Sequence, residues 1–330
     1  MKDIHELTGR ISDIANGYMR AQVLFSATAA NVFAHLEEPR TAAEAAQAVG
    51  WHPKGAARLL DALVALEFIT KADGKYRNAE IASKCLVPGR ENYQGHIVLH
   101  NRNCCENWER LDEALEAGSG VTGERRERSP EDLRHFILGM SNIARLSAQD
   151  MLGVLDISRY TNTLDVGGGP ATYPIAFLKA KPKMRATVFD LPPVVDIAKE
   201  QVQEAGLTDR FEFVSGDLTT DAFPKGYDFV LLSNIIHMLV PAGIKDLFRK
   251  CCDALEPGGE LIIKDFLTNE DRTGPPFSLM FALHMYVNTA EGGTYSVGEI
   301  EAWCKDAGFA KGRLVELTPQ SRMWIATKAE

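Results

Sequence analysis

Short apolar runs alternate with segments of helical apolar spacing over the second half of the chain, from residue 163 onward. The runs have the length and the β-branched and aromatic content of buried strands, whereas the segments between them repeat apolar residues with a helical period. Such alternation predicts a parallel sheet built from strand–helix–strand units. We expect its strands at 163–166, 186–190, 211–217, 227–234 and 260–266, followed by a closing antiparallel pair at 312–317 and 321–328.

The N-terminal part has a different pattern, in which helices come first and a small hairpin follows. Apolar spacing predicts helix over 12–36, and Thr41 with Glu44 forms a capping box at the start of a short helix. Pro53 begins the next helix, and a turn at 72–74 joins two short strands. Helix, turn, helix and hairpin in this order predict a winged helix.

A winged helix has two common uses, DNA binding and subunit packing. The second helix would read DNA, but its Lys54 and Arg58 are offset by Asp61 and Glu67. We therefore favour packing or dimerisation and keep a DNA-binding ligand sensor as the less favoured alternative. The expected parts are a winged-helix dimerisation domain at 1–88, a helical connector at 89–150 and an α/β catalytic domain at 151–330.

Composition and charge narrow the possible partners. The formal net charge of −9 argues against nucleic acid or an acidic membrane, which would require a basic face. No apolar run reaches the roughly 18 residues that span a bilayer, and residues 1–10 lack an apolar signal core, so we expect a cytosolic protein. The six cysteines include two adjacent pairs without metal-finger spacing, so no metal site is expected.

Three glycines follow the first strand of the α/β domain. Glycine permits positive φ and close approach to the backbone, so 167–169 predicts a nucleotide-binding turn. Asp190 ends the next strand about 20 residues later, where an acid binds ribose hydroxyls. Thr172 stands where a dinucleotide fingerprint has its third glycine, and no P-loop lysine follows, so phosphates lack a dedicated contact. Asp217 and Leu218 suit the amino group and ring of an adenine, which favours an adenosine without pyrophosphate.

The motifs DVGGGPA, VFDLP, SGDL, SNIIH and EPGG together resemble those of the S-adenosylmethionine-dependent small-molecule O-methyltransferases. That family includes caffeate, acetylserotonin and bacterial polyketide O-methyltransferases. The segments PRTAAEAAQAVG and LLDALVALEF are similar to its dimerisation domain, so the resemblance covers nearly the whole chain. It implies a Rossmann-like class I sheet of seven strands in the order 3-2-1-4-5-7-6, and an intertwined homodimer whose N-terminal helices help line the partner's substrate pocket.

The resemblance also implies S-adenosylmethionine as the methyl donor, held at the carboxyl ends of the strands. The residues expected to bind it are Asp165, Gly167, Gly168, Gly169, Asp190, Leu191, Gly216, Asp217, Leu218, Ser233 and Asn234.

Methyl transfer is an in-line displacement that requires alignment of the nucleophile with the methyl group, and a hydroxyl nucleophile must also lose its proton. His237 corresponds to the catalytic histidine of the family, and Asp265 to an acid that orients it. Three positions depart from the family pattern. Met238 replaces an acid after the histidine, Ser233 replaces a lysine before it, and Tyr295 stands in place of a second orienting carboxylate.

These departures weaken the general-base machinery and leave the donor site intact. Methylation of a thiol or thioether therefore competes with O-methylation, because sulfur needs little or no base, and His237 would then only position the substrate. A carbon acceptor is a weaker competitor, and a dehydrogenase is a further alternative that binding of NAD would reveal. The residues expected to contact a small-molecule acceptor are Trp108, Phe136, Met140, Met280, His284, Met285, Asn288 and Tyr295.

Overall fold

A computed structural model describes residues 3–121, 130–289 and 291–330. The chain divides into two compact units, Met1–Cys105 and Glu106–Glu330. The boundary falls inside helix α6 (Gly95–Trp108), so the expected connector at 89–150 is shared between the two units.

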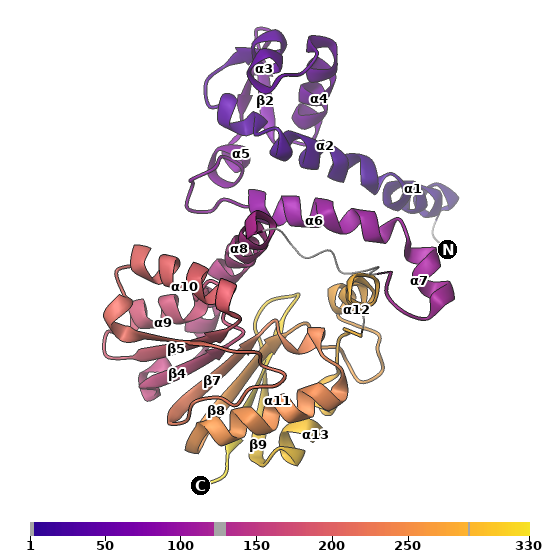
Figure 1. The fold of residues 1–330 in the computed structure, drawn as a ribbon. Coiled ribbons are helices and arrows are strands. Elements are labelled where there is room, and N and C mark those ends of the chain that lie inside the picture. The colour runs from indigo at the N-terminus through magenta and orange to yellow at the C-terminus, as the bar shows by residue number, and fades with distance from the viewer. Residues whose placement is uncertain (1–2, 122–129, 290) are drawn as a thin grey trace. The chain divides into compact units, whose positions relative to one another are not determined.

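Helices and a small sheet make up the first unit (Figure 1). The apolar spacing at 12–36 corresponds to three helical pieces rather than one, because Asn16 and the left-handed Asn31 interrupt it. The three short strands pair in the order β1-β3-β2. The elements are α1 (Ile4–Ala15), α2 (Gly17–Ala29), η1 (Val32–His35), β1 (Arg40–Thr41), α3 (Ala42–Val49), α4 (Pro53–Ala65), β2 (Ile69–Ala72), β3 (Lys75–Asn78) and α5 (Glu80–Cys85).

Local sequence signals account for how these helices begin and end. The Thr41 side chain accepts from the Glu44 backbone N–H, and the Glu44 carboxylate accepts from the Thr41 N–H at 2.7 Å, which confirms the capping box. Gly50 ends α3 with φ of 72°, a left-handed conformation that glycine adopts at low cost. Pro53 is the first residue of α4, as predicted.

The second unit alternates strands and helices around one large sheet. After α6 its elements are α7 (Leu111–Ala117), α8 (Pro130–Val154), η2 (Ile157–Arg159), β4 (Asn162–Val166), α9 (Thr172–Ala180), β5 (Arg185–Asp190), α10 (Pro192–Glu204), η3 (Thr208–Arg210), β6 (Phe211–Ser215), β7 (Tyr227–Ser233), η4 (Ile236–Met238), α11 (Pro241–Ala254), β8 (Leu255–Asp265), α12 (Pro276–Asn288), α13 (Val297–Asp306), β9 (Phe309–Glu316) and β10 (Arg322–Lys328).

The large sheet has seven strands in the order β6-β5-β4-β7-β8-β10-β9. Strands β4 to β8 pair in parallel, whereas β10 runs antiparallel to both β8 and β9. Numbered from β4, this order is 3-2-1-4-5-7-6, which confirms the predicted topology and the closing antiparallel pair.

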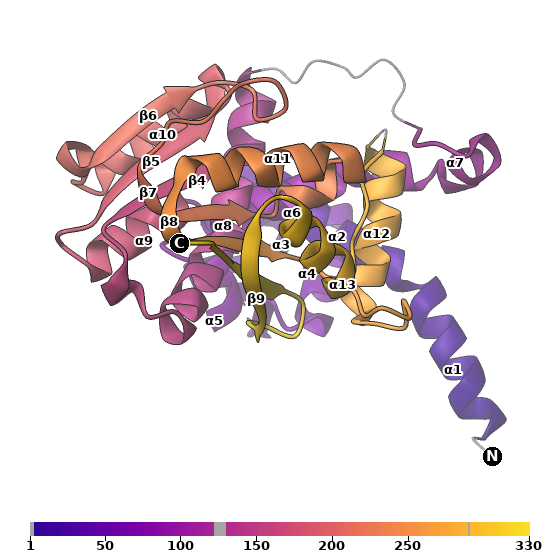
Figure 2. The ribbon, with the colours of Figure 1, turned by 90° about the horizontal axis from the view of Figure 1, so that it is seen from below.

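Helices cover both faces of this sheet. Successive strand residues point to opposite faces, and both faces are apolar, so each must be covered. In β7, Val230 and Leu232 pack with α11 and α13, whereas Phe229 and Leu231 pack with α8, α9 and α10. Figures 1 and 2 show α11 on the side of the sheet away from α9. We call the side covered by α8, α9 and α10 the α9 face.

The parallel strands place their carboxyl ends at one edge of the sheet. The glycine turn, Asp190, Asn234 and Asp265 all follow or end strands there. In an open α/β sheet this edge is where ligands bind. No helix among the described residues is long and apolar enough to cross a membrane.

Candidate functional site

The glycine turn after β4 disfavours side chains, through lack of room at Gly167 and Gly168 and through positive φ at Gly167 and Gly169. Gly167 and Gly169 have φ of 66° and 52°, values that favour glycine. A Cβ on Gly168 would lie 2.7 Å from the Asp165 Oδ2 atom, and one on Gly167 would lie 2.3 Å from Ile235 Cδ1. The turn therefore presents bare backbone between β4 and α9, as an adenosine-binding turn requires.

Asp190, at the end of β5, is tied to the glycine turn. Its Oδ2 accepts from the Gly169 N–H at 2.9 Å, and its Oδ1 accepts from the Leu191 N–H at 2.7 Å. Burial raises the pKa of Asp190, and these two hydrogen bonds act against that shift. The side chain of Leu191 is largely exposed beside it.

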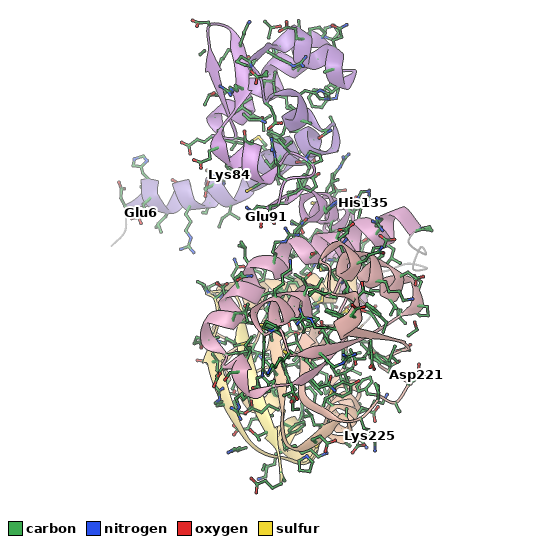
Figure 3. All side chains as sticks on the ribbon, turned by 90° about the vertical axis from the view of Figure 1, so that its left-hand side faces the viewer. Glu6, Lys84, Glu91, His135, Asp221 and Lys225 are labelled. Atoms are coloured by element: carbon green, nitrogen blue, oxygen red, sulfur yellow. The ribbon has the colours of Figure 1, made fainter. Side chains whose placement is uncertain are left out.

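The loop after β6, which carries Asp217 and Leu218, begins beside Asp190, since Ser215 is paired with Asp190 and the Gly216 N–H donates to the Asp190 carbonyl at 3.0 Å. Asp217 is exposed, and hydrogen bonds from the Thr219 hydroxyl and backbone N–H lower its pKa. The Asp217 N–H donates to Asp221, which Figure 3 labels on this loop, at 2.8 Å. Leu218 packs against the core under the turn.

Neighbouring strand ends carry further expected donor-binding residues. Gly216 lies against the Phe189 ring, where a Cβ would come within 2.5 Å. Asn234 adopts a left-handed conformation with φ of 56° directly after β7.

Two polar atoms at these strand ends are buried without a partner. The Asp165 Oδ2 and Ser233 Oγ atoms have no hydrogen-bond partner within the described part of the chain. Burial, followed by the neighbouring Asp190 charge, raises the pKa of Asp165 to about 8.

His237 and Asp265 form a buried pair. The imidazole Nδ1 lies 2.9 Å from the Asp265 Oδ1 atom, which also accepts from the Phe266 N–H at 2.8 Å. Burial acts to raise the pKa of Asp265, but the His237 charge and the two hydrogen bonds hold it below its usual range. The ionised carboxylate fixes the Nδ1 proton, so the Nε2 atom is the nitrogen that is left to accept a proton.

The segment after α12 closes over the His237 backbone. The Gly293 N–H donates to the His237 carbonyl at 2.9 Å. A Cβ on Gly292 would lie 2.7 Å from the same carbonyl oxygen and 2.5 Å from Thr289 Oγ1, so only glycine fits there. The glycine pair thus holds the histidine through its main chain.

Tyr295 does not take the place of a second orienting acid. Its ring is buried against Trp303, and its hydroxyl donates to the Leu239 carbonyl. The expected substrate contact of Tyr295 finds no support in this geometry, because both its ring and its hydroxyl are already engaged. Met238 is largely exposed.

Aromatic side chains surround the imidazole of His237. The ring of Phe281 meets it edge-on at 5.0 Å between centroids, and Phe266 lies at 6.2 Å. On its other side Phe281 stacks on His284 at 5.5 Å. These rings form a continuous apolar wall from β8 to α12, of the kind that suits an aromatic acceptor.

His284 has a defined tautomer when neutral. The Trp108 Nε1–H can only donate, and it lies 3.0 Å from the His284 Nδ1 atom, so the neutral ring carries its proton on Nε2. Burial, followed by the nearby His237, lowers the pKa of His284 and favours this neutral form. Asn288 donates to the His284 carbonyl at 2.9 Å and accepts from Asn107 at 3.0 Å, which ties α12 to the segment before α7.

The remaining expected acceptor contacts are dispersed. Met280 is largely exposed and Met285 is buried, so the two do not share one environment with His284 on α12. Phe136, on α8, packs toward Val194 and Ile197 of α10. Met140, on the same helix, is half-buried. The structure thus brings Trp108, His284 and Asn288 together and places Phe136 in another cluster.

Comparison with known proteins identifies the architecture. Residues 108–310 match the O-methyltransferase domain, and residues 12–88 match the O-methyltransferase dimerisation domain. The chain belongs to the O-methyltransferase family. As a member of it, this methyltransferase uses the S-adenosylmethionine-dependent fold that the sequence motifs predicted, and the resemblance is confirmed.

Three relatives of this methyltransferase illustrate the family. 3-hydroxy-5-methyl-1-naphthoate 3-O-methyltransferase of Streptomyces sahachiroi is 32% identical over 92% of this chain and 90% of its own. L-tyrosine C(3)-methyltransferase of Streptomyces lavendulae is 30% identical over 76% and 72%. The crystal structure of human N-acetylserotonin methyltransferase in complex with S-adenosylmethionine superposes with a TM-score of 0.90 at 26% identity, covering 100% of this chain and 99% of that one.

Some residues of this site were not expected from the sequence. Gly292 and Gly293 contact the His237 backbone, and Lys264 reaches Asn234 from the neighbouring strand at 3.1 Å. A lysine inside the otherwise apolar run LIIKDF is the sequence signal that could have indicated this position.

Proposed function

We propose that this protein transfers a methyl group from S-adenosylmethionine to a hydroxyl group of a small aromatic molecule, with His237 as the general base. The observation that carries the proposal is the buried contact of 2.9 Å between His237 Nδ1 and Asp265 Oδ1. In this contact the Nδ1–H of the ring donates to the Asp265 carboxylate, so the Nε2 atom is left to accept the proton of the acceptor's hydroxyl group.

The residues at the strand ends fit the methyl donor. The glycine turn presents bare backbone, and the buried Oδ2 of Asp165 has no partner within the described ranges, so this edge offers close approach to the main chain and an unused polar atom. Asp190 would hold the ribose, and Asp217 the adenine. When bound, S-adenosylmethionine supplies the methyl group on its sulfonium.

The aromatic wall supports an aromatic acceptor. Phe266 and Phe281 flank His237, and a planar ring packed against them would bring its hydroxyl toward the imidazole. The Nε2–H of neutral His284 provides a hydrogen-bond donor on the same wall. Trp108, His284 and Asn288 are therefore the proposed acceptor contacts that the structure supports best.

A sulfur acceptor is the second candidate. Tyr295 is turned to the Leu239 carbonyl, so no second carboxylate replaces the missing acid beside His237 at that position. A thiol needs less assistance from a base than a hydroxyl does. The C-methylating relative shows that this family is not confined to oxygen acceptors.

Replacement of His237 by Ala separates these candidates. With labelled S-adenosylmethionine and a panel of phenols, thiols and thioethers, we expect methylation of a phenol and a loss on the order of a hundredfold or more in the variant. A loss of only a few-fold, with a thiol as the best acceptor, would favour sulfur. Binding of S-adenosylhomocysteine by calorimetry is the control, because the variant should retain it.

The quaternary state and location belong to the same proposal. The match of 12–88 to an O-methyltransferase dimerisation domain supports a homodimer. A cytosolic location and a small-molecule acceptor, rather than nucleic acid or a membrane, are the further parts of the proposal, and they rest on the net charge of −9 and on the family. If the winged helix bound DNA, α4 would enter the groove. Asp61 puts a negative charge on this helix, and it pairs with Lys71 of the neighbouring strand β2 at 2.6 Å, which offsets the positive charge of that lysine.

A further inference from the structure

Three neighbouring strands of the large sheet end in polar side chains on one face. Lys264 follows Ile262 by two residues in β8, and Ser233 follows Leu231 by two in β7, so both point to the α9 face on which those apolar residues pack. Asp165 in β4 lies between two residues that pack on the opposite side, so it also points to the α9 face.

Lys264, Asp165 and the Oγ atom of Ser233 are buried, and much of their hydrogen-bonding capacity is unused. The Lys264 side chain is 2% exposed, and its ammonium donates to one neutral oxygen, the Asn234 Oδ1 atom at 3.1 Å. The Ser233 Oγ and Asp165 Oδ2 atoms have no partner among the residues that the structure describes. Burying an ammonium costs free energy unless charge and hydrogen bonds compensate it, and the nearby charge of Asp265 compensates it in part.

The three residues occupy adjoining positions. Ser233 and Lys264 are paired across β7 and β8, and Asp165 pairs with Leu231, two residues before Ser233. An acid on β4 and an ammonium on β8 thus stand on either side of β7. Asp165 is a neutral acid in the free protein, and a ligand ammonium beside it would favour its negative form, across from the positive Lys264. This is the charge pattern that a zwitterionic amino acid would complement, and the methyl donor ends in such a group.

We propose that Lys264 binds the carboxylate of the methionine part of the donor, with Ser233 donating to the same group and Asp165 facing its ammonium. The proposal rests on the proposed function and assigns a residue to it. The lysine that the family resemblance expects at 233 is absent, and Lys264 supplies an ammonium from the paired position on the next strand.

The competing explanation is structural. Lys264 contacts Asn234, whose left-handed backbone begins the turn toward His237, so the lysine would only hold that turn. A structural lysine would affect all donors alike, whereas a carboxylate-binding lysine discriminates between donors with and without that group.

Lys264→Met tests this with S-adenosylmethionine and its decarboxylated form, which lacks only the carboxylate. We expect the wild type to prefer the complete donor, and the variant to lose about 10- to 100-fold of that preference, measured as the ratio of the two dissociation constants. Binding of the decarboxylated donor should stay the same or improve, because a buried cation no longer faces a cationic ligand. Equal weakening of both donors, or an unchanged ratio, would overturn the proposal.

Controls keep the outcomes distinct. If the wild type binds neither S-adenosylmethionine nor S-adenosylhomocysteine, the proposed function fails, whatever the variant does. Lys328→Met removes an ammonium that bonds backbone carbonyls at the far end of β10, and it should leave the ratio unchanged. Thermal unfolding verifies the fold of each variant, and Lys264→Gln replaces Lys264→Met if that variant does not fold.

Discussion

At the scale of single residues, two fully buried carboxyl groups on nearby strands are in opposite electrostatic situations. Asp265 bonds His237 and the Phe266 N–H, and its pKa is lowered despite its burial. Asp165 has one oxygen without a partner, and burial together with Asp190 raises its pKa to about 8. The same side chain thus serves as a fixed negative charge in one place and as a neutral acid in the other.

The raised pKa of Asp165 predicts how stability depends on pH. The folded protein keeps this proton up to about pH 8, whereas the unfolded chain releases it near pH 4, so the group lowers the free energy of unfolding as pH rises between these values. We expect Asp165→Asn to remove this dependence, which amounts to about 2 kcal/mol between pH 6 and pH 8.

Denaturant unfolding of the ligand-free wild type and Asp165→Asn at several pH values measures this difference. The variant should gain stability relative to the wild type as pH rises toward 8. Parallel pH profiles for the two proteins would contradict the assignment, because they would mean that Asp165 is ionised in the folded state throughout.

At the scale of elements, the turn after α12 controls the position of His237 through the main chain. Gly292→Ala places a Cβ 2.7 Å from the His237 carbonyl oxygen, so the turn or the histidine must shift. We expect turnover to fall tenfold or more, since a displacement of about 1 Å at a reacting group can cost a hundredfold. Donor binding should be retained, because the glycine turn after β4 is untouched.

The adjacent glycine offers a matched control. A Cβ on Gly293 would meet nothing within 4 Å, although its N–H donates to the same carbonyl. Gly293→Ala should therefore retain nearly wild-type turnover. Steady-state kinetics of both variants decides the matter, and similar losses in the two would show that the space beside the His237 carbonyl is not the cause.

Elements governed by local or repeating signals could be predicted from the sequence. The capping box at Thr41, the parallel strands and the glycine turn follow from period, propensity and short motifs. The break at Asn31 could not be predicted, because apolar spacing continues across it while one left-handed residue interrupts the helix. His237 and Asp265 are predictable from the family resemblance, and the structure shows that they are in contact.

The rest of the site depends on tertiary contacts that sequence spacing does not encode. Tyr295 follows the glycine pair as a family acid does, yet its hydroxyl turns to Leu239 because the ring is buried against Trp303. The same limit applies to the contact between Trp108 and His284, since 176 positions separate them. The spacing on α12 predicts acceptor contacts from both Met280 and Met285, but Met280 is largely exposed and Met285 is buried.

At the scale of the whole molecule, helix α1 presents an apolar stripe that no described residue of its own unit buries. Ile4, Leu7, Ile11 and Ile14 recur at helical spacing and are 45% to 72% exposed, and α1 contains no buried residue. Such a stripe on a soluble protein marks an interaction surface. Because the dimerisation-domain match begins within this helix, at residue 12, a second copy of the chain is the expected occupant.

Charge placed on this stripe should therefore dissociate the dimer. Ile11→Lys with Ile14→Lys would bury two unpaired ammonium groups in an interface, which costs several kcal/mol and should shift the protein to a monomer at micromolar concentration. Ser12→Lys adds one such charge on α1 outside the stripe and should leave the dimer intact. Sedimentation velocity measures the oligomeric state. A monomeric wild type would contradict the homodimer itself, and a doubly substituted protein that stayed dimeric would place the interface elsewhere.

Thermal unfolding distinguishes dissociation from misfolding. Since each unit has its own core, loss of the dimer should leave the unfolding of the methyltransferase unit almost unchanged.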